Sequence, residues 1–119
     1  MTTKIRQVLS ADSITGTPVQ NMGSEDWGEI KELMIDLSEG RIAYAVLSFG
    51  GFLGMGDKLF AIPWEAFSVV QDEKTFLLDV AKEKLEQAPG FDKDNWPDMA
   101  DVTWGQGIHD YYGYSPYWG

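Results

Sequence analysis

The sequence has no cysteine, a single histidine and few basic residues, and each shortage excludes a class of function. Without cysteine the chain can form no disulfide, no thiolate nucleophile and no cysteine-ligated zinc site. Nine lysines and arginines stand against nineteen aspartates and glutamates, which gives a net charge of -10. A surface of that sign repels the phosphates of nucleic acids and anionic membrane headgroups. We therefore expect no nucleic acid partner and no membrane insertion.

Long hydrophobic runs are also missing. No stretch approaches the roughly 20 apolar residues of a membrane-spanning helix, and the N-terminus lacks the continuous apolar region of a signal peptide. These absences favour a soluble cytoplasmic protein. The chain has 119 residues, of which 44% are hydrophobic and 24% charged, and this composition suits one globular core.

Residues 40–63 form the stretch around which the predicted fold is organised. Residues 41–49 are apolar on both faces of an extended strand, and a loop with four glycines separates them from a second strand at 57–62. A strand that is apolar on both faces requires cover on both. We expect the barrel interior to cover one face, and either the chain's own C-terminal segment or a second subunit to cover the other.

Short elements surround this hairpin. Residues 28–38 alternate polar and apolar, but Ile30 is out of phase with the later apolar positions, which predicts a bulge near Lys31 or Glu32. The sequence therefore predicts a mostly β protein, a small antiparallel β-barrel of five or six strands with a short helix, over residues 1–88. Its other elements are an edge strand at 4–9, a helical turn capped by Ser10, strands at 17–20, 68–70 and 75–80, a single turn at 64–67 and a helix at 81–88.

Residues 89–119 differ in character from the rest of the chain. They hold half of the sixteen aromatic residues, a density that disordered segments rarely show. Asp101 or Thr103 can cap a helix that runs to about Tyr112. We expect this aromatic C-terminal extension to pack on the barrel or on a second subunit.

Four segments carry a family resemblance: GTPV at 16–19, GEIKELMID at 28–36, GRIAYAVLSFGGFLGMGDKLFAIPW at 40–64 and APGFDKDNWPDM at 88–99. Together they resemble the PRC-barrel family, with the barrel at about residues 5–85, and in particular the cytoplasmic barrel of the photosynthetic reaction-centre H subunit. The resemblance implies a small, mostly antiparallel barrel that often self-associates and docks on proteins rather than catalysing reactions. The membrane-spanning helix of the H subunit has no counterpart here, so its role is not expected to transfer.

No group of residues forms a recognisable catalytic site. The loop at 51–58 nearly matches a phosphate-binding loop, but Asp57 stands where the lysine belongs and a strand follows instead of a helix. His109 has no identifiable nucleophile to serve, and Ser48 lies inside an apolar strand. We predict a non-enzymatic protein without a cofactor. Four carboxylates are expected to be solvated strand and turn charges: Glu29, Glu32, Asp36 and Glu39.

The features together favour a protein-protein interaction or assembly adaptor. We expect a homodimer whose acidic exterior suits a basic protein partner. The side chains of the glycine loop are unusually apolar, and either contact a partner or fold back over the barrel. The candidate interaction residues are Phe49, Phe52, Leu53, Met55, Trp64, Trp96, Trp104, Tyr111, Tyr112 and Trp118.

The alternative function is a small-ligand or divalent-cation-binding module in the acidic segment after Phe91. Asp92, Asp94 and Asp98 offer the oxygen ligands that calcium prefers, although their spacing fails the EF-hand pattern. Capping and turn formation by these aspartates is the competing interpretation.

Overall fold

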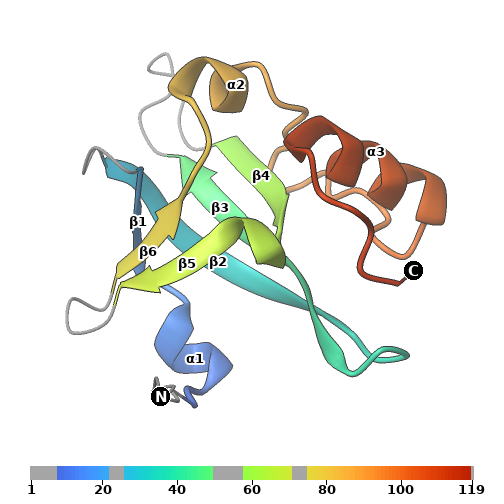
Figure 1. Cartoon of the computed structure of the whole chain (residues 1–119), viewed down its shortest axis with the longest axis horizontal. Coiled ribbons are helices and arrows are strands. Elements are labelled where there is room, and N and C mark those ends of the chain that lie inside the picture. The colour runs from blue at the N-terminus through green and yellow to red at the C-terminus, as the bar shows by residue number, and fades with distance from the viewer. Residues whose placement is uncertain (1–7, 22–25, 50–57, 71–74, 119) are drawn as a thin grey trace, which may run out of the picture.

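The computed structural model describes residues 8–21, 26–49, 58–70 and 75–118 (Figure 1). Six strands form one sheet in the order β4-β3-β2-β1-β6-β5. The strands are β1 (Pro18–Gln20), β2 (Asp26–Asp36), β3 (Arg41–Phe49), β4 (Lys58–Pro63), β5 (Phe67–Val70) and β6 (Thr75–Leu78). The helices are α1 (Ala11–Ile14), the 3-10 helix η2 (Trp64–Ala66), α2 (Lys82–Glu86) and α3 (Val102–Tyr112).

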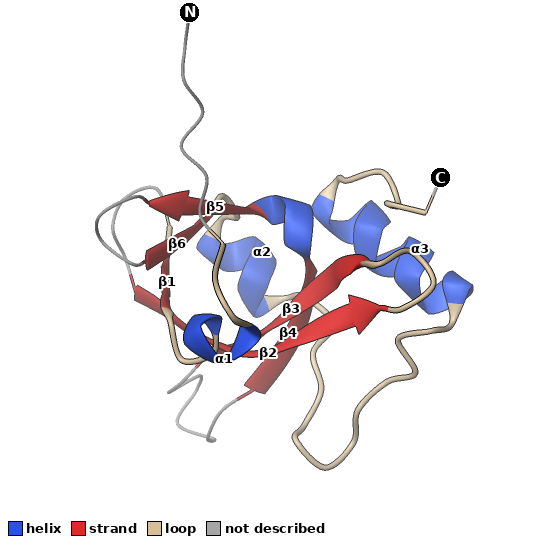
Figure 2. Cartoon of the chain, turned by 90° about the horizontal axis from the view of Figure 1, so that it is seen from below, coloured by secondary structure: helices blue, strands red, loops and turns tan. Residues whose placement is uncertain are grey.

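The sheet curls into a half-barrel, which confirms the predicted mostly β fold (Figure 2). Four of its neighbouring strand pairs are antiparallel, whereas β1 and β6 are parallel through Val19 opposite Phe76. The sheet is therefore mostly antiparallel, as the family resemblance implies, and the sequence did not predict this one parallel pairing. A tight turn can join only antiparallel strands. Because β1 and β6 lie far apart in the sequence, no such turn joins them and they can pair in parallel.

Two stretches of the prediction fall wholly or partly outside the described residues. Most of the edge strand expected at 4–9 does so, and its last two residues, Val8 and Leu9, are not in a strand. The glycine loop with Phe52, Leu53 and Met55 also lies outside the described part.

The predicted bulge in β2 is present. The pairing of β2 with β3 shifts register between Ile30 and Glu32, and shifts again between Met34 and Ile35. Bulges bend a strand and increase its twist, so they help the long β2–β3 hairpin to curl. Figure 1 shows this hairpin reaching beyond the body of the sheet, with its tip below the N-terminal end of α3.

Gly28 allows β2 to approach β3 closely. Its φ is +112°, and a Cβ placed there would lie 2.0 Å from the backbone carbonyl oxygen of Ser48. Only glycine fits such a contact in that conformation without moving the backbone. The position therefore fixes how closely the two central strands pass each other.

The hydrophobic core fills the curled sheet, and short helices lie at its two ends. Trp27 and Phe60 are among the largest fully buried side chains, and Ile14 of α1 belongs to the same cluster as Leu85 of α2. In Figure 1, α1 and α2 lie at opposite ends of the curled sheet. Within the described residues no helix is long and apolar enough to cross a membrane.

The outer face of β3 lies beneath residues 102–118, which we call the aromatic cover. The ring of Tyr44 in β3 lies 5.2 Å from the ring of Trp104, 5.5 Å from that of His109 and 6.4 Å from that of Tyr117, measured between centroids. Ile108 of α3 is also buried in the core cluster. The second apolar face of the strand is therefore covered by the same chain.

The start of α3 agrees with the sequence pattern. Asp101 is the N-cap, and its Oδ1 accepts a hydrogen bond of 2.9 Å from the backbone N–H of Thr103. The helix ends after Tyr112 at Gly113, which adopts a left-handed conformation with φ of 81°. Both ends thus carry a recognisable cap, which explains why the sequence located this helix well.

Candidate functional site

Most of the predicted interaction residues that the structure describes are half-buried and pack against other side chains of the same chain. The ring of Phe49 lies 5.7 Å from the ring of Trp27, edge to face, and Trp64 stacks on Phe67 at 5.8 Å. Trp96 differs, because 39% of its surface is exposed. It borders a hollow of about 500 Å³ that is also lined by polar side chains near Phe91.

The predicted residues of α3 and the C-terminal segment tie the cover to the rest of the molecule. The hydroxyl of Tyr111 donates a hydrogen bond of 2.5 Å to the backbone carbonyl of Lys84 in α2. Trp104 packs on the sheet, Tyr112 is buried, and the indole of Trp118 lies 5.2 Å from the ring of His109. These side chains hold the cover in place within the chain.

The acidic segment after Phe91 is not gathered into a metal site. The carboxylate of Asp98 accepts the backbone N–H of Ala100 at 3.1 Å, and the backbone carbonyl of Asp92 accepts that of Asn95 at 3.0 Å. Across the described residues, which include Asp94, no group of three or more acidic or histidine side chains could hold a metal ion. Turn formation accounts for the roles of Asp92 and Asp98 that the structure shows.

A hollow of about 620 Å³ lies between the tip of the β2–β3 hairpin, the start of α3 and the C-terminal segment. We call it the tip hollow. It is lined by residues 34–39, 43–44, 99–102 and 117–118. Segments from three distant parts of the sequence thus meet around one space, which no single stretch of the sequence could reveal.

Exposed apolar side chains gather at the tip hollow. Ile35 is 55% exposed, Leu37 89% and Val102 62%. Half of the six large hydrophobic side chains that are exposed in the described part of the chain therefore line this one hollow. Sequence reasoning missed them, although Leu37 carries a signal, since it is an apolar residue in an otherwise polar turn.

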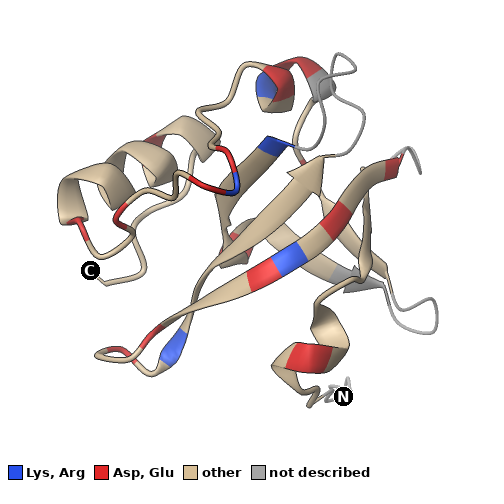
Figure 3. Ribbon diagram, turned by 180° about the vertical axis from the view of Figure 1, so that it is seen from behind, with Lys and Arg blue, Asp and Glu red and all other residues tan. Residues whose placement is uncertain are grey.

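The tip hollow is also acidic. Asp36, Glu39 and Asp101 line it, and none of its described lining residues is lysine or arginine. Figure 3 shows acidic residues on the hairpin tip and at the start of α3, two of the segments that line the hollow. The site therefore combines an apolar rim with negative charge.

Asp36 has a structural role that goes beyond a solvated charge. Its Oδ1 accepts the backbone N–H groups of Ser38 at 2.9 Å and Glu39 at 3.1 Å, and its Oδ2 accepts the hydroxyl of Tyr117 at 2.5 Å. The hydrogen bond from Tyr117 and those from the turn backbone lower the pKa of the Asp36 carboxyl below its ordinary value of 3.8. Burial and the same hydrogen bond raise the pKa of Tyr117.

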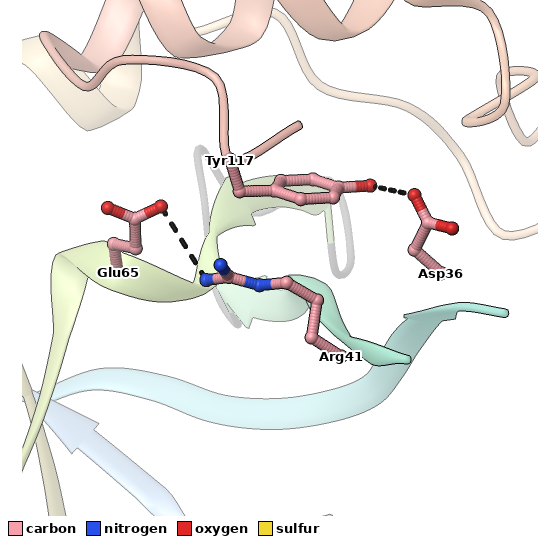
Figure 4. Close-up of polar contacts among 4 residues, drawn as sticks. All are labelled: Asp36, Arg41, Glu65 and Tyr117. Atoms are coloured by element: carbon pink, nitrogen blue, oxygen red, sulfur yellow. Dashed lines mark hydrogen bonds and ion pairs between the residues drawn. The ribbon is translucent and has the colours of Figure 1, made fainter. Parts of the chain in front are cut away.

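Arg41 lies against the face of the Tyr117 ring, whereas Asp36 accepts a hydrogen bond from the hydroxyl of that ring (Figure 4). Its guanidinium carbon lies 5.1 Å from the ring centroid, and one of its nitrogens lies 3.7 Å from a carboxylate oxygen of Glu65. A cation over an aromatic face is attracted by the ring quadrupole. The C-terminal segment is thus attached to the hairpin by a hydrogen bond and by a cation-π contact.

Tyr44 is the buried polar side chain of the tip hollow. It is 1% exposed, and its hydroxyl has no hydrogen-bond partner among the described residues. Burial, and then the charge of Asp36, raise its pKa to about 12. The close approach of α3 depends on Gly105, because a Cβ there would lie 2.7 Å from the Tyr44 hydroxyl and 2.8 Å from the Trp118 ring.

The curled sheet with a helix at each end defines a small β-barrel domain. The family model of the PRC-barrel domain matches residues 6–85. The chain therefore belongs to the PRC-barrel family, as the sequence resemblance predicts, and residues 89–119 lie beyond the match.

One similar solved structure is that of a 16S ribosomal RNA processing protein, RimM, from Pseudomonas aeruginosa. The TM-score is 0.45 and the sequence identity 14%, and the similarity covers 63% of this chain and 45% of that protein. The chain thus spans less than half the length of this relative. No curated protein matches the sequence.

Proposed function

We propose that this PRC-barrel protein is a non-enzymatic adaptor that docks an apolar, basic segment of a partner protein in the tip hollow. The observation that carries the proposal is the gathering of Ile35, Leu37 and Val102 around one hollow. Exposed apolar side chains that gather in one place point to an interaction site, whereas single scattered ones are normal on any protein surface.

Apolar burial supplies the affinity in this proposal. Covering a leucine or isoleucine side chain fully is worth about 1.5–3 kcal/mol, and Leu37 is almost entirely exposed in the free chain. Burying it against a partner therefore yields more than burying Ile35 or Val102, which are already partly covered. We expect Leu37 to be the main apolar contact.

Charge supplies the specificity. The carboxylates of Asp36, Glu39 and Asp101 face a site without a lining lysine or arginine in the described chain. Complementary potentials speed association and exclude partners of the wrong sign. A segment with lysine or arginine beside its apolar residues satisfies both requirements, whereas an acidic segment is repelled.

Panning a library of displayed peptides against the whole protein tests the proposal. Wild-type protein is expected to enrich peptides that combine apolar and basic residues, and Leu37→Asp is expected to lose them. Val8→Asp is the matched control, because Val8 is 94% exposed but lies outside the lining of the tip hollow. Failure to enrich any peptide, or enrichment that survives Leu37→Asp, would contradict the docking role.

A homodimer stays a prediction, and its expected basis has changed. The outer face of β3, which suggested a second subunit, is packed against Trp104, His109 and Tyr117 of the same chain. Light scattering of the full chain measures the molar mass. A dimer that Leu37→Asp dissociates would make a second copy the occupant of the tip hollow, whereas a monomer is expected if the occupant is another protein.

A further inference from the structure

We propose that the docked segment anchors in the tip hollow through one arginine side chain, which lies between the carboxylates of Glu39 and Asp101 and the aromatic residues Tyr117 and Trp118. This inference rests on the proposed docking function and names the group that the hollow selects. It follows from the acidic and aromatic side chains that line the hollow and from the absence of lysine and arginine among its described lining residues.

The lining chemistry favours a cation on an apolar stem. Tyr117, Trp118, Met34 and Met99 present aromatic and thioether surface, on which the methylene groups of a long side chain can pack. The carboxylates stand at the hairpin tip and at the N-cap of α3. A purely apolar side chain would leave those charges partly desolvated without a partner, which costs free energy.

Asp36 has less acceptor capacity left than Asp101, so it contributes mainly charge. Its two oxygens already accept hydrogen bonds from Ser38, Glu39 and Tyr117. Asp101 uses Oδ1 to cap α3 at Thr103. A carboxylate has about four acceptor positions, so Asp101 retains acceptor capacity for a guanidinium donor.

Arginine suits this site better than lysine. Its guanidinium is planar, weakly hydrated and stacks on aromatic rings, and its fork of donors can reach two acceptors together. The molecule already contains an arginine held between an aromatic ring and a carboxylate, because the Arg41 guanidinium lies over the ring of Tyr117 and beside Glu65. Arg41 itself is not a lining residue of the tip hollow, and Glu65 offsets its charge.

The first experiment measures the affinity of a peptide selected by the panning. Replacing its arginine by lysine is expected to weaken binding about fivefold, and replacing it by glutamine more strongly, because the guanidinium loses its stacking and then its charge. Equal affinity of the arginine, lysine and glutamine peptides would overturn the arginine anchor while leaving the docking function intact. A failure to select any peptide would instead remove the docking function.

The second experiment changes the protein. Asp101→Asn is expected to weaken the arginine peptide about threefold to fivefold while keeping the helix cap, since asparagine caps as well as aspartate. Asp98→Asn is the matched control, because Asp98 also accepts a backbone N–H but does not line the tip hollow. The glutamine peptide should respond equally to both variants. Equal weakening of the arginine peptide by both would overturn the anchor.

The third experiment needs no peptide. Titration of the isotope-labelled full chain with butylguanidinium is expected to shift the backbone amide signals of Leu37, Asp101 and Trp118 at lower concentration than butylammonium does. Butylurea, which is planar but neutral, serves as the control. Absence of shifts at these residues, or equal shifts with butylurea, would overturn the anchor independently of whether a partner peptide is found.

Discussion

The barrel interior and the face beneath the aromatic cover differ in how completely their polar atoms are paired. Four buried side-chain polar atoms lack a hydrogen-bond partner in the described part of the chain, and only the indole N–H of Trp27 belongs to the sheet interior. The others are the hydroxyl of Tyr44, Nε2 of His109 and the hydroxyl of Tyr112, and all three belong to α3 or to the residue beneath it. The cover is therefore the less satisfied of the two packings.

This difference suggests which part of the molecule opens first. A buried polar group without a partner costs about 1–3 kcal/mol relative to a paired one. Each such deficit lowers the free energy needed to open the region that holds it, and among the described residues the sheet interior has one deficit against three beneath the cover. We therefore expect the cover to loosen before the sheet, and the predictions below compare the two regions from the largest expected effect to the smallest.

The largest effect is expected in the sheet, at Gly28. Gly28→Ala should lower the free energy of unfolding by roughly 3 kcal/mol or more, because it adds both backbone strain and an overlap with a backbone carbonyl. Urea unfolding followed by circular dichroism measures it. Gly16→Ala is the control, since Gly16 has φ of +86° but open space around it. Equal losses in the two variants would show that β2 and β3 are not fixed at this distance.

A smaller effect is expected under the cover, at Gly105. Gly105→Ala should lower the free energy of unfolding by about 1–3 kcal/mol, because the new methyl group meets the ends of Tyr44 and Trp118, which can shift more easily than backbone. Gly107→Ala in the same helix meets nothing within 4 Å and should raise it by about 0.5–1 kcal/mol. If Gly105→Ala and Gly107→Ala both raised the free energy of unfolding, Gly105 would not lie in close contact with Tyr44 and Trp118.

The smallest effect is expected from acid, at the contact between Asp36 and Tyr117. The pKa of Asp36 is lower in the folded chain than its ordinary value of 3.8, so its contribution to stability is present above that pH and is lost as the pH falls through the folded pKa. Measured between pH 5 and pH 2, the fall in stability should be shallower in Tyr117→Phe than in wild type. Tyr114→Phe, which leaves the contact intact, should behave as wild type; an unchanged slope in Tyr117→Phe would refute the link.

Local signals explain the parts of the fold that the sequence predicts. The bounds of β3, at residues 41–49, follow from a continuous apolar run between two turns, and the bulge in β2 follows from the phase of Ile30. The cap at Asp101 locates α3 in the same way. Each of these features depends on residues close together in the chain, which is why a single sequence is sufficient.

Non-local features could not be predicted in this way. The parallel pairing of β1 with β6 and the tip hollow both bring together segments that are far apart in the sequence. The predicted interaction residues illustrate a second difficulty. Large aromatic side chains are favoured in cores and in interfaces alike, so composition could not separate the buried Tyr112 from the exposed Trp96. An apolar residue in a polar turn, such as Leu37, was a better sign of an exposed apolar site than the aromatic residues were.

The pairing of β1 with β6 has a consequence for the kinetics of folding. The β2–β3–β4 meander consists of hairpins between consecutive strands, whereas Val19 can meet Phe76 only after the intervening chain has closed into a loop. Closing a loop of this length costs conformational entropy before any stabilising contact forms between its ends, and proteins with such topologies fold slowly. We expect the meander to form early and the joining of β1 to β6 to be the late step that completes the half-barrel.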